Sequence, residues 1–186
     1  MPSDRSGQHG KRIVVGVTGA SGLIYAVDLL ETMAHLDVAS RLVVTAGAKH
    51  VIPTELTGSL HDLEALASRS YKDADLGADI ASGSYRFDGM AVVPCSAGTL
   101  AKIASGAADS LLTRAAHVAL KERRPLVLVV REAPYSRPML VNMLAAHDAG
   151  AVILPAAPGF YHRPESIRQL VGSVTARVLD QLGINN

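Results

Sequence analysis

Apolar residues gather in five short runs along the chain, each without the polar alternation of a half-exposed strand. Such runs, rich in β-branched side chains, are typical of strands that are buried on both faces of a parallel sheet. Small and polar residues follow each run. The expected strands are Ile13–Val17, Arg41–Thr45, Gly89–Pro94, Leu126–Val130 and Ala151–Pro155.

Between the runs, apolar residues recur three and four positions apart, as they do on one face of a helix. The expected helices are Leu23–Met33, Gly47–Ile52, Leu60–Ala67, Leu100–Ala104, Asp109–Glu122, Pro138–His147 and Pro164–Leu182. Strands that alternate with helices predict an α/β fold with a doubly wound, mostly parallel sheet, Rossmann-like or flavodoxin-like. We expect a single domain over residues 11–186. The polar residues 1–10 lack a signal-peptide core and are expected to be a disordered lead-in.

Composition narrows the classes of partner. Hydrophobic residues make up 48% of the 186 residues, and the mean hydropathy of +0.22 is high for a monomer. No apolar run approaches the ~20 residues of a membrane helix, so we expect a large oligomer interface instead. A net charge of +1 and the absence of Trp argue against nucleic acid. Cys95 is the only cysteine, which excludes an internal disulfide and fits a reducing cytoplasm.

The turn after the first strand, Gly19-Ala20-Ser21-Gly22, is the first candidate site. A strand, a small-residue turn and a helix start together present backbone N–H groups and a positive dipole end to a phosphate. An ordinary turn with glycines for close packing is an equal alternative. The glycine spacing is wrong for an NAD site, and the second strand ends in the hydroxyl of Thr45 without a carboxylate for a ribose. We therefore expect a nucleotide or flavin phosphate but not NAD.

Other polar residues follow the expected strands at the edge where parallel sheets bind ligands. Ser96-Ala97-Gly98-Thr99 forms a second small-residue turn, and Arg131 and Glu132 follow the fourth strand. A charged pair directly after a buried strand is a functional candidate. Cys95 is interpreted as a packed small side chain, since no neighbour would lower the pKa of its thiol.

Further candidates have two interpretations each. Arg114, His117 and Lys121 form a polar stripe on one helix, which is either solvated or binds an anion or a neighbouring subunit. Arg177 lies at the edge of a buried stripe and reaches either a cleft or a surface ion pair. The histidines lack zinc-ligand spacing, and neither a nucleophile elbow nor a Walker lysine occurs. Metal hydrolysis, acyl transfer and ATP hydrolysis therefore lose support.

Several motifs stand together in this chain: Gly19–Gly22, Pro94–Thr99, Arg114–Leu128, Arg131–Pro134, and Gly150–Pro155 with Phe160–Arg163. In this combination they resemble the UbiX/Pad-type flavin prenyltransferases, over nearly everything from Lys11 to Gly183. The resemblance implies a flavoprotein fold and a metal-independent transfer of a dimethylallyl group from dimethylallyl monophosphate to N5 and C6 of reduced FMN. It also implies a homo-oligomer, usually a dodecamer with sites between subunits, and delivery of prenylated FMN to a UbiD-type decarboxylase.

The resemblance also implies roles for individual residues. The implied FMN contacts are Gly19, Ala20, Ser21, Gly22, Thr45, Ser96, Ala97, Gly98, Thr99 and Arg131. The implied prenyl-phosphate contacts are Lys121, Tyr161 and Arg177, with Arg114 nearby. Ser21 and Glu132 match a pair that moves protons at the flavin. Glu55, which the sequence places in a loop, would protonate the leaving phosphate if its pKa were raised.

Two alternatives stay open on the same fold. One is a flavin-dependent cysteine decarboxylase, although Pro138–Met143 matches the substrate clamp of that class poorly. The other is a non-catalytic FMN-binding subunit of a decarboxylase system. Family members commonly carry a Trp in a tail after the last helix, and this chain has no Trp. Two expectations follow from this difference: either the activity is weaker, or another segment closes the prenyl pocket.

Overall fold

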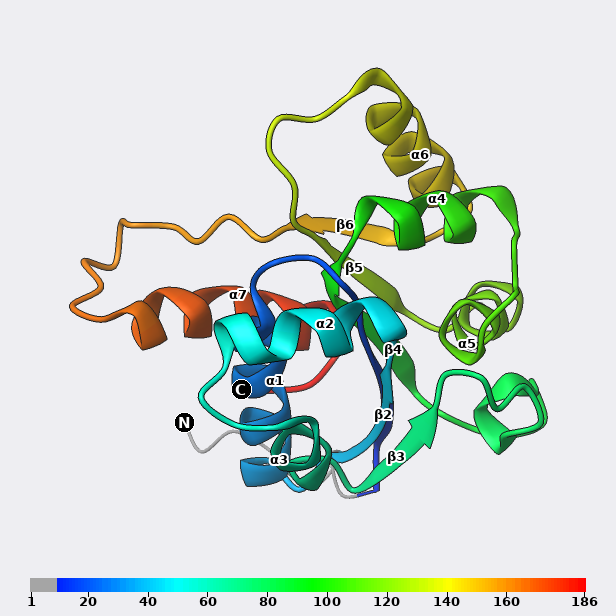
Figure 1. The fold of residues 1–186 in the computed structure, drawn as a ribbon, viewed down its shortest axis with the longest axis horizontal. Coiled ribbons are helices and arrows are strands. Elements are labelled where there is room, and N and C mark those ends of the chain that lie inside the picture. The colour runs from blue at the N-terminus through cyan, green and yellow to red at the C-terminus, as the bar shows by residue number, and fades with distance from the viewer. Residues whose placement is uncertain (1–9) are drawn as a thin grey trace.

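The computed structural model describes residues 10–186, so the expected lead-in lies outside the described residues except for Gly10. Its centre is a six-stranded sheet in the order β3-β2-β1-β4-β5-β6, in which every neighbouring pair is parallel (Figure 1). The strands are β1 (Arg12–Val17), β2 (Ala39–Val44), β3 (Arg69–Lys72), β4 (Gly89–Cys95), β5 (Leu126–Val130) and β6 (Val152–Pro155).

The five expected strands are present, and β3 is an addition that the sequence analysis missed. This strand is a short edge strand that pairs with β2 alone. Only Tyr71 among its four residues is buried, so it lacks the apolar run that marks the central strands. The edge position explains the polar sequence, because an edge strand packs fewer of its side chains.

Residues 10–186 also form seven α-helices and one 3₁₀ turn, of which the last helix follows β6 and the others lie between strands. They are α1 (Leu23–His35), α2 (Ala46–Glu55), α3 (Leu60–Ala65), η1 (Asp79–Ala81), α4 (Ala97–Ser105), α5 (Leu111–Lys121), α6 (Arg137–Asp148) and α7 (Ile167–Gln181). All seven expected helices are found, with bounds that differ by a few residues. The expectation that Glu55 lies in a loop is wrong, because α2 continues through Pro53 and Glu55 is its last residue.

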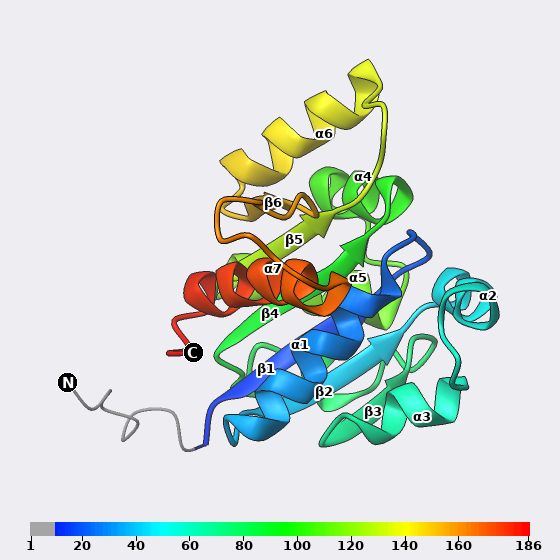
Figure 2. The same cartoon turned by 90° about the vertical axis from the view of Figure 1, so that its left-hand side faces the viewer.

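The helices cover both faces of the sheet, which confirms the doubly wound arrangement (Figure 2). On one face, α1 and α7 pack over Ile13, Val15 and Val17 of β1. On the other, α4 and α5 pack over Val14 and its neighbours, while α6 lies mainly on α4. Among residues 10–186, no helix combines the length and apolarity needed to cross a bilayer.

The sheet order reverses direction between β1 and β4. The chain builds β2 and β3 on one side of β1 and returns to place β4, β5 and β6 on the other. At such a switch point, the connections that follow the two central strands run in opposite directions. Ligands of open α/β sheets bind in the crevice between them. The residues after β1 and β4 are therefore the first place to examine for a site.

Candidate functional site

The turn Gly19–Gly22 after β1 has a geometry that requires its glycines. A Cβ on Gly19 would lie 2.8 Å from the carbonyl carbon of Gly47, because the start of α2 packs directly against this turn. Gly22, the N-cap of α1, has a φ of +105°, a left-handed conformation that side chains disfavour. Close packing thus accounts for Gly19 and the left-handed backbone for Gly22, and Ser21 is exposed between them.

Glu55 caps α1 from a distant position in the sequence. Its carboxylate accepts the backbone N–H of Gly22 at 2.8 Å and that of Leu23 at 2.9 Å. Partial burial alone would raise the pKa of Glu55, but the hydrogen bond from the Ser21 hydroxyl and those two N–H bonds outweigh it, so the pKa is lowered. The raised pKa that a proton donor would need is absent here. In this structure Glu55 is a charged acceptor that holds Ser21 and the start of α1.

This capping predicts an acid-sensitive stability that depends on Glu55. Because the pKa of Glu55 is lower in the folded protein, its contribution is present above the unfolded-state pKa and is lost as pH falls through the folded-state value. We expect Glu55→Ala, which removes the acceptor, to lose roughly 1 kcal/mol at neutral pH, as for a lost helix cap. The difference in melting temperature between wild type and variant should shrink as the pH falls below the ordinary glutamate pKa of about 4.3. A difference that is constant across that range would contradict the capping role.

Two hydroxyl groups begin the helices that follow β2 and β4. Thr45 Oγ1 accepts the N–H of Ala48 at 3.3 Å and donates to Val17 O at 3.1 Å. Ser96 Oγ accepts the N–H of Thr99 at 3.3 Å and lies 3.1 Å from its hydroxyl. Three adjacent strands thus end at the starts of α1, α2 and α4, each with a positive dipole end. Thr45, Ser96 and Thr99 are only partly buried, so an anion can reach this edge of the sheet.

Arg131, at the end of β5, bridges to the first turn. Its Nε donates to the carbonyl oxygen of Ser21 at 3.1 Å, and its backbone N–H donates to Cys95 O at 3.3 Å. The adjacent Glu132 is partly buried, and its carboxylate accepts the N–H of Ala133 at 3.1 Å. The structure therefore joins Ser21, Glu55 and Arg131 directly, whereas the hydrogen bond of the Glu132 carboxylate runs to Ala133 within its own loop.

Thr18 was missed by the sequence analysis. Its side chain is 1% exposed, although it directly precedes the turn. The hydroxyl donates to Pro94 O at 2.7 Å and accepts the N–H of Ser96 at 2.8 Å. A threonine between a buried strand and a glycine turn was the available signal. Cys95, in contrast, behaves as expected, since burial raises the pKa of its thiol to about 12 and keeps it protonated.

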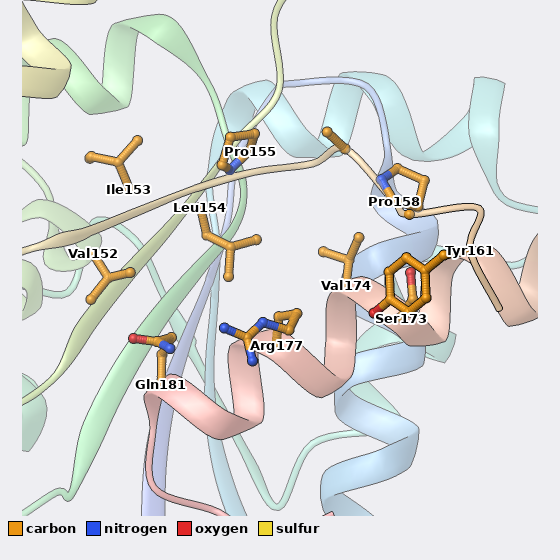
Figure 3. Close-up of a pocket in the computed structure, with 12 residues that line it drawn as sticks. Val152, Ile153, Leu154, Pro155, Pro158, Tyr161, Ser173, Val174, Arg177 and Gln181 are labelled. Atoms are coloured by element: carbon orange, nitrogen blue, oxygen red, sulfur yellow. The ribbon is translucent and has the colours of Figure 1, made fainter.

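A second part of the candidate site lies beside the edge strand β6. A cavity of about 490 Å³ separates β6 and its following loop from α7 (Figure 3). Tyr161 and Arg177 both line this cavity, as the sequence analysis grouped them. Arg177 also pairs with Asp180, with 2.7 Å between Nη1 and Oδ2. Tyr161 is 91% exposed on its loop. The other lining residues are Val152, Ile153, Leu154, Pro155, Ala157, Pro158, Gly159, Ser173, Val174 and Gln181.

Lys121 and Arg114 do not join this cavity within one chain. Both are exposed on α5, which packs on the opposite face of the sheet from α7. Lys121 is the last residue of α5 and pairs with Glu122. The helix ends there because the chain must return to start β5, so Lys121 also lies at the sheet edge opposite Ser21. The expected grouping of Lys121 with Tyr161 and Arg177 is therefore not formed by a single chain.

The His, Cys, Asp and Glu side chains of residues 10–186 do not gather into a metal centre. In that part of the chain, no group of three or more His, Cys, Asp or Glu side chains is placed to hold a metal ion. The switch point holds hydroxyls, backbone N–H groups and Arg131, which are donors to an anion, while the Glu55 carboxylate takes up the N–H groups of Gly22 and Leu23 at the start of α1. The arrangement suits a phosphate-bearing ligand.

Comparison with known proteins agrees with this chemistry. A family model described as Flavoprotein matches residues 2–172. A flavin prenyltransferase UbiX from Deinococcus radiodurans is 64% identical over 174 residues, which is 94% of this chain and 89% of that protein. The crystal structure of AnUbiX (PadA1) in complex with FMN and dimethylallyl pyrophosphate is similar with a TM-score of 0.92 and 43% identity, covering 94% of this chain and 93% of that one.

A second structure is the dodecameric FMN-dependent UbiX-like decarboxylase from Escherichia coli O157:H7. It is similar with a TM-score of 0.91 and 46% identity, over 94% of this chain and 96% of that one. These similarities extend along almost the whole chain and include the strand ends that carry the candidate residues. The chain therefore belongs to the UbiX family of flavin prenyltransferases.

Proposed function

We propose that this protein transfers a dimethylallyl group from dimethylallyl monophosphate to N5 and C6 of reduced FMN, without a metal. The product, prenylated FMN, then serves a UbiD-type decarboxylase. The observation that carries the proposal is the 64% identity to a flavin prenyltransferase along 94% of the chain. We favour this function over that of a cysteine decarboxylase or a non-catalytic subunit because of the same similarity. The lone, buried thiol of Cys95 is compatible with a reducing cytoplasm.

The donor groups at the switch point fit FMN. Backbone N–H groups and hydroxyls of Ser96–Thr99 and Thr45 suit the phosphate, and Arg131 adds a cation beside Ser21. At Gly19 and Gly22 this turn brings main chain without side chains to the edge of the sheet, where a flat ring can approach closely. When bound and reduced, FMN supplies the nucleophilic N5 and C6. We assign Ser21 and Glu132 to proton movement at those atoms.

The Arg177 cavity suits the departing phosphate. A monophosphate leaves poorly unless cations and hydrogen-bond donors stabilise the negative charge that develops on it. Arg177 and the Tyr161 hydroxyl can supply these from one chain, and Lys121 and Arg114 can supply them from another. Glu55 is the remaining candidate. Its carboxylate accepts the N–H groups of Gly22 and Leu23 next to Ser21, so we assign it to holding the turn that carries Ser21.

Assembly into a homo-oligomer, a dodecamer by similarity, would bring these parts together. One helix offers a surface for it, since α6 exposes Leu140, Val141 and Leu144 at 52%, 50% and 61%. An apolar row on an amphipathic helix normally packs against another surface. The helix lies on the outside of α4, so its far face has no cover within the described part of the chain (Figure 1).

We therefore expect the double variant Leu140→Glu with Leu144→Glu to break the assembly. Each buried leucine contributes roughly 1.5–3 kcal/mol to an interface, and a glutamate in its place adds a desolvation cost. Light scattering after size exclusion should show a smaller species than the wild type. Leu76→Glu is the control, since Leu76 is 44% exposed but lies in the loop after β3. An unchanged mass for the double variant would remove α6 from the interface.

The proposed reaction is tested by mass spectrometry of the flavin. The protein is incubated without oxygen with reduced FMN and either dimethylallyl monophosphate or the diphosphate. We expect the flavin to gain the mass of one prenyl unit with the monophosphate. FMN that is bound but unchanged in mass with both donors would favour the non-catalytic subunit. Release of CO₂ from a peptide that ends in cysteine would instead favour the cysteine decarboxylase.

A further inference from the structure

We propose that Thr18 is a positioning residue that sets the separation of the two turns between which FMN is held. These turns are Gly19–Gly22 after β1 and Ser96–Thr99 after β4. The inference rests on the proposed function, since it concerns the same flavin site. It adds a residue that does not touch the ligand and acts through the turns on either side.

The switch point needs such a link because the backbone ladder stops short of it. The register of β1 with β4 extends from Ile13 opposite Gly89 to Gly16 opposite Val92. Beyond Val92 the register of β4 with β5 also shifts. The last residues of both strands, Val17 of β1 and Val93–Cys95 of β4, therefore lie beyond the register of β1 with β4. Main-chain pairing does not determine how far apart the two turns stand.

Thr18 supplies a side-chain link in place of the missing ladder. Its single hydroxyl donates to Pro94 O at 2.7 Å and accepts the N–H of Ser96 at 2.8 Å. One O–H group thus bridges two consecutive peptide groups on either side of Cys95. Because the hydroxyl is 1% exposed, water does not compete for these bonds.

The bridge determines where α4 begins. Ser96 is the N-cap of α4, and its side chain bonds to Thr99 in the first turn of that helix. Holding the Ser96 N–H to Thr18 therefore orients the cap and the N–H groups that follow it. On the other side, Thr18 adjoins Gly19, whose main chain is already fixed by contact with Gly47. The two turns then move as one unit.

Burial excludes a direct role for Thr18. A side chain that is 1% exposed and has both bonds inside the protein cannot contact substrate. Its effect must appear as altered binding by the residues that it positions. The effect should also exceed what an equally buried hydroxyl elsewhere in the sheet produces.

The experiment compares Thr18→Val with Thr18→Ser. Valine keeps the shape and removes both hydrogen bonds, whereas serine keeps the hydroxyl. The measured quantities are the Kd for FMN from flavin fluorescence, the visible absorption of bound flavin, and the melting temperature with and without FMN. We expect Thr18→Val to raise the Kd by about tenfold or more and to alter the flavin absorption. We expect Thr18→Ser to stay within about threefold of wild type.

Ser40→Ala is the matched control. Ser40 is 3% exposed, accepts the N–H of Ser68 at 3.1 Å and lies near the start of β2, at the opposite edge of the sheet. This variant should lower the melting temperature and leave the Kd for FMN unchanged. Equal Kd values for Thr18→Val and wild type would overturn the inference even if the variant were less stable. If the valine variant does not fold, Thr18→Cys takes its place, because a thiol forms longer and weaker hydrogen bonds than a hydroxyl. Its Kd for FMN must then be higher than the Kd values of wild type and Thr18→Ser.

The outcomes separate this inference from the proposed function. A wild-type protein that does not bind FMN overturns both. A wild-type protein that binds FMN but transfers no prenyl group overturns the transferase alone, and the comparison of Thr18 variants still decides the positioning role. Serine that fails to rescue the Kd, with a normal melting temperature, would show that the methyl group and not the hydroxyl matters, which also overturns the inference.

Discussion

Subunits that carry Lys121→Ala and subunits that carry Arg177→Ala should each be inactive alone and active when assembled together. Lys121 ends α5 on one face of the sheet, and Arg177 lies in the cavity between α7 and β6 on the other side. If both cations serve one leaving phosphate, they must come from different chains. Each substitution alone should lower turnover by about 100-fold, since a charge-stabilising donor is lost from every site.

The mixed assembly has a quantitative expectation. In a random one-to-one mixture, a site receives intact Lys121 with probability one half and intact Arg177 with probability one half, so about a quarter of the sites regain both. Prenyl transfer should recover to about a quarter of the wild-type rate after the two variants are unfolded, mixed and refolded. Mixing without exchange of subunits is the control and should give no recovery. If prenyl transfer does not recover although subunit exchange is verified, both cations of a site come from the same chain.

The central part of the fold could be predicted because strands buried on both faces have continuous apolar sequences. β1, β4 and β5 are uninterrupted apolar runs, and each was expected within one or two residues of its observed bounds. The edge strand β3 has no such apolar run, since only Tyr71 among its residues is buried in a core. The prediction of a loop at Glu55 was wrong for a related reason. The helix α2 has few buried residues, and Pro53 is a residue that normally ends a helix.

The candidate site was predictable only where its residues follow strands. Gly19–Gly22, Ser96–Thr99 and Arg131 meet at the switch point because parallel strands end at the same edge. The capping bonds of Glu55 and the bridge made by Thr18 depend on how distant segments pack, which no local pattern encodes. The separation of Lys121 from Arg177 likewise follows from the faces on which α5 and α7 pack. A motif shared with a family identifies such residues without saying which chain supplies them.

Glu132→Gln should retain FMN and lose prenyl transfer. The residue follows Arg131 at the end of β5, next to the side chain that contacts the Ser21 carbonyl. A glutamine keeps the shape and an oxygen that can accept the Ala133 N–H, which Glu132 accepts at 3.1 Å. It cannot take the proton that leaves C6 of the flavin. Loss of a general base typically lowers the rate by 10²–10⁴-fold, so we expect turnover to fall by about 100-fold or more.

The measurement separates binding from chemistry. FMN affinity and melting temperature should stay at wild-type values, while the single-turnover rate of flavin mass increase falls. Glu64→Gln, a partly buried glutamate on α3 away from the switch point, is the matched control and should change neither quantity. Unchanged turnover in Glu132→Gln would mean that a group other than Glu132 acts as the base.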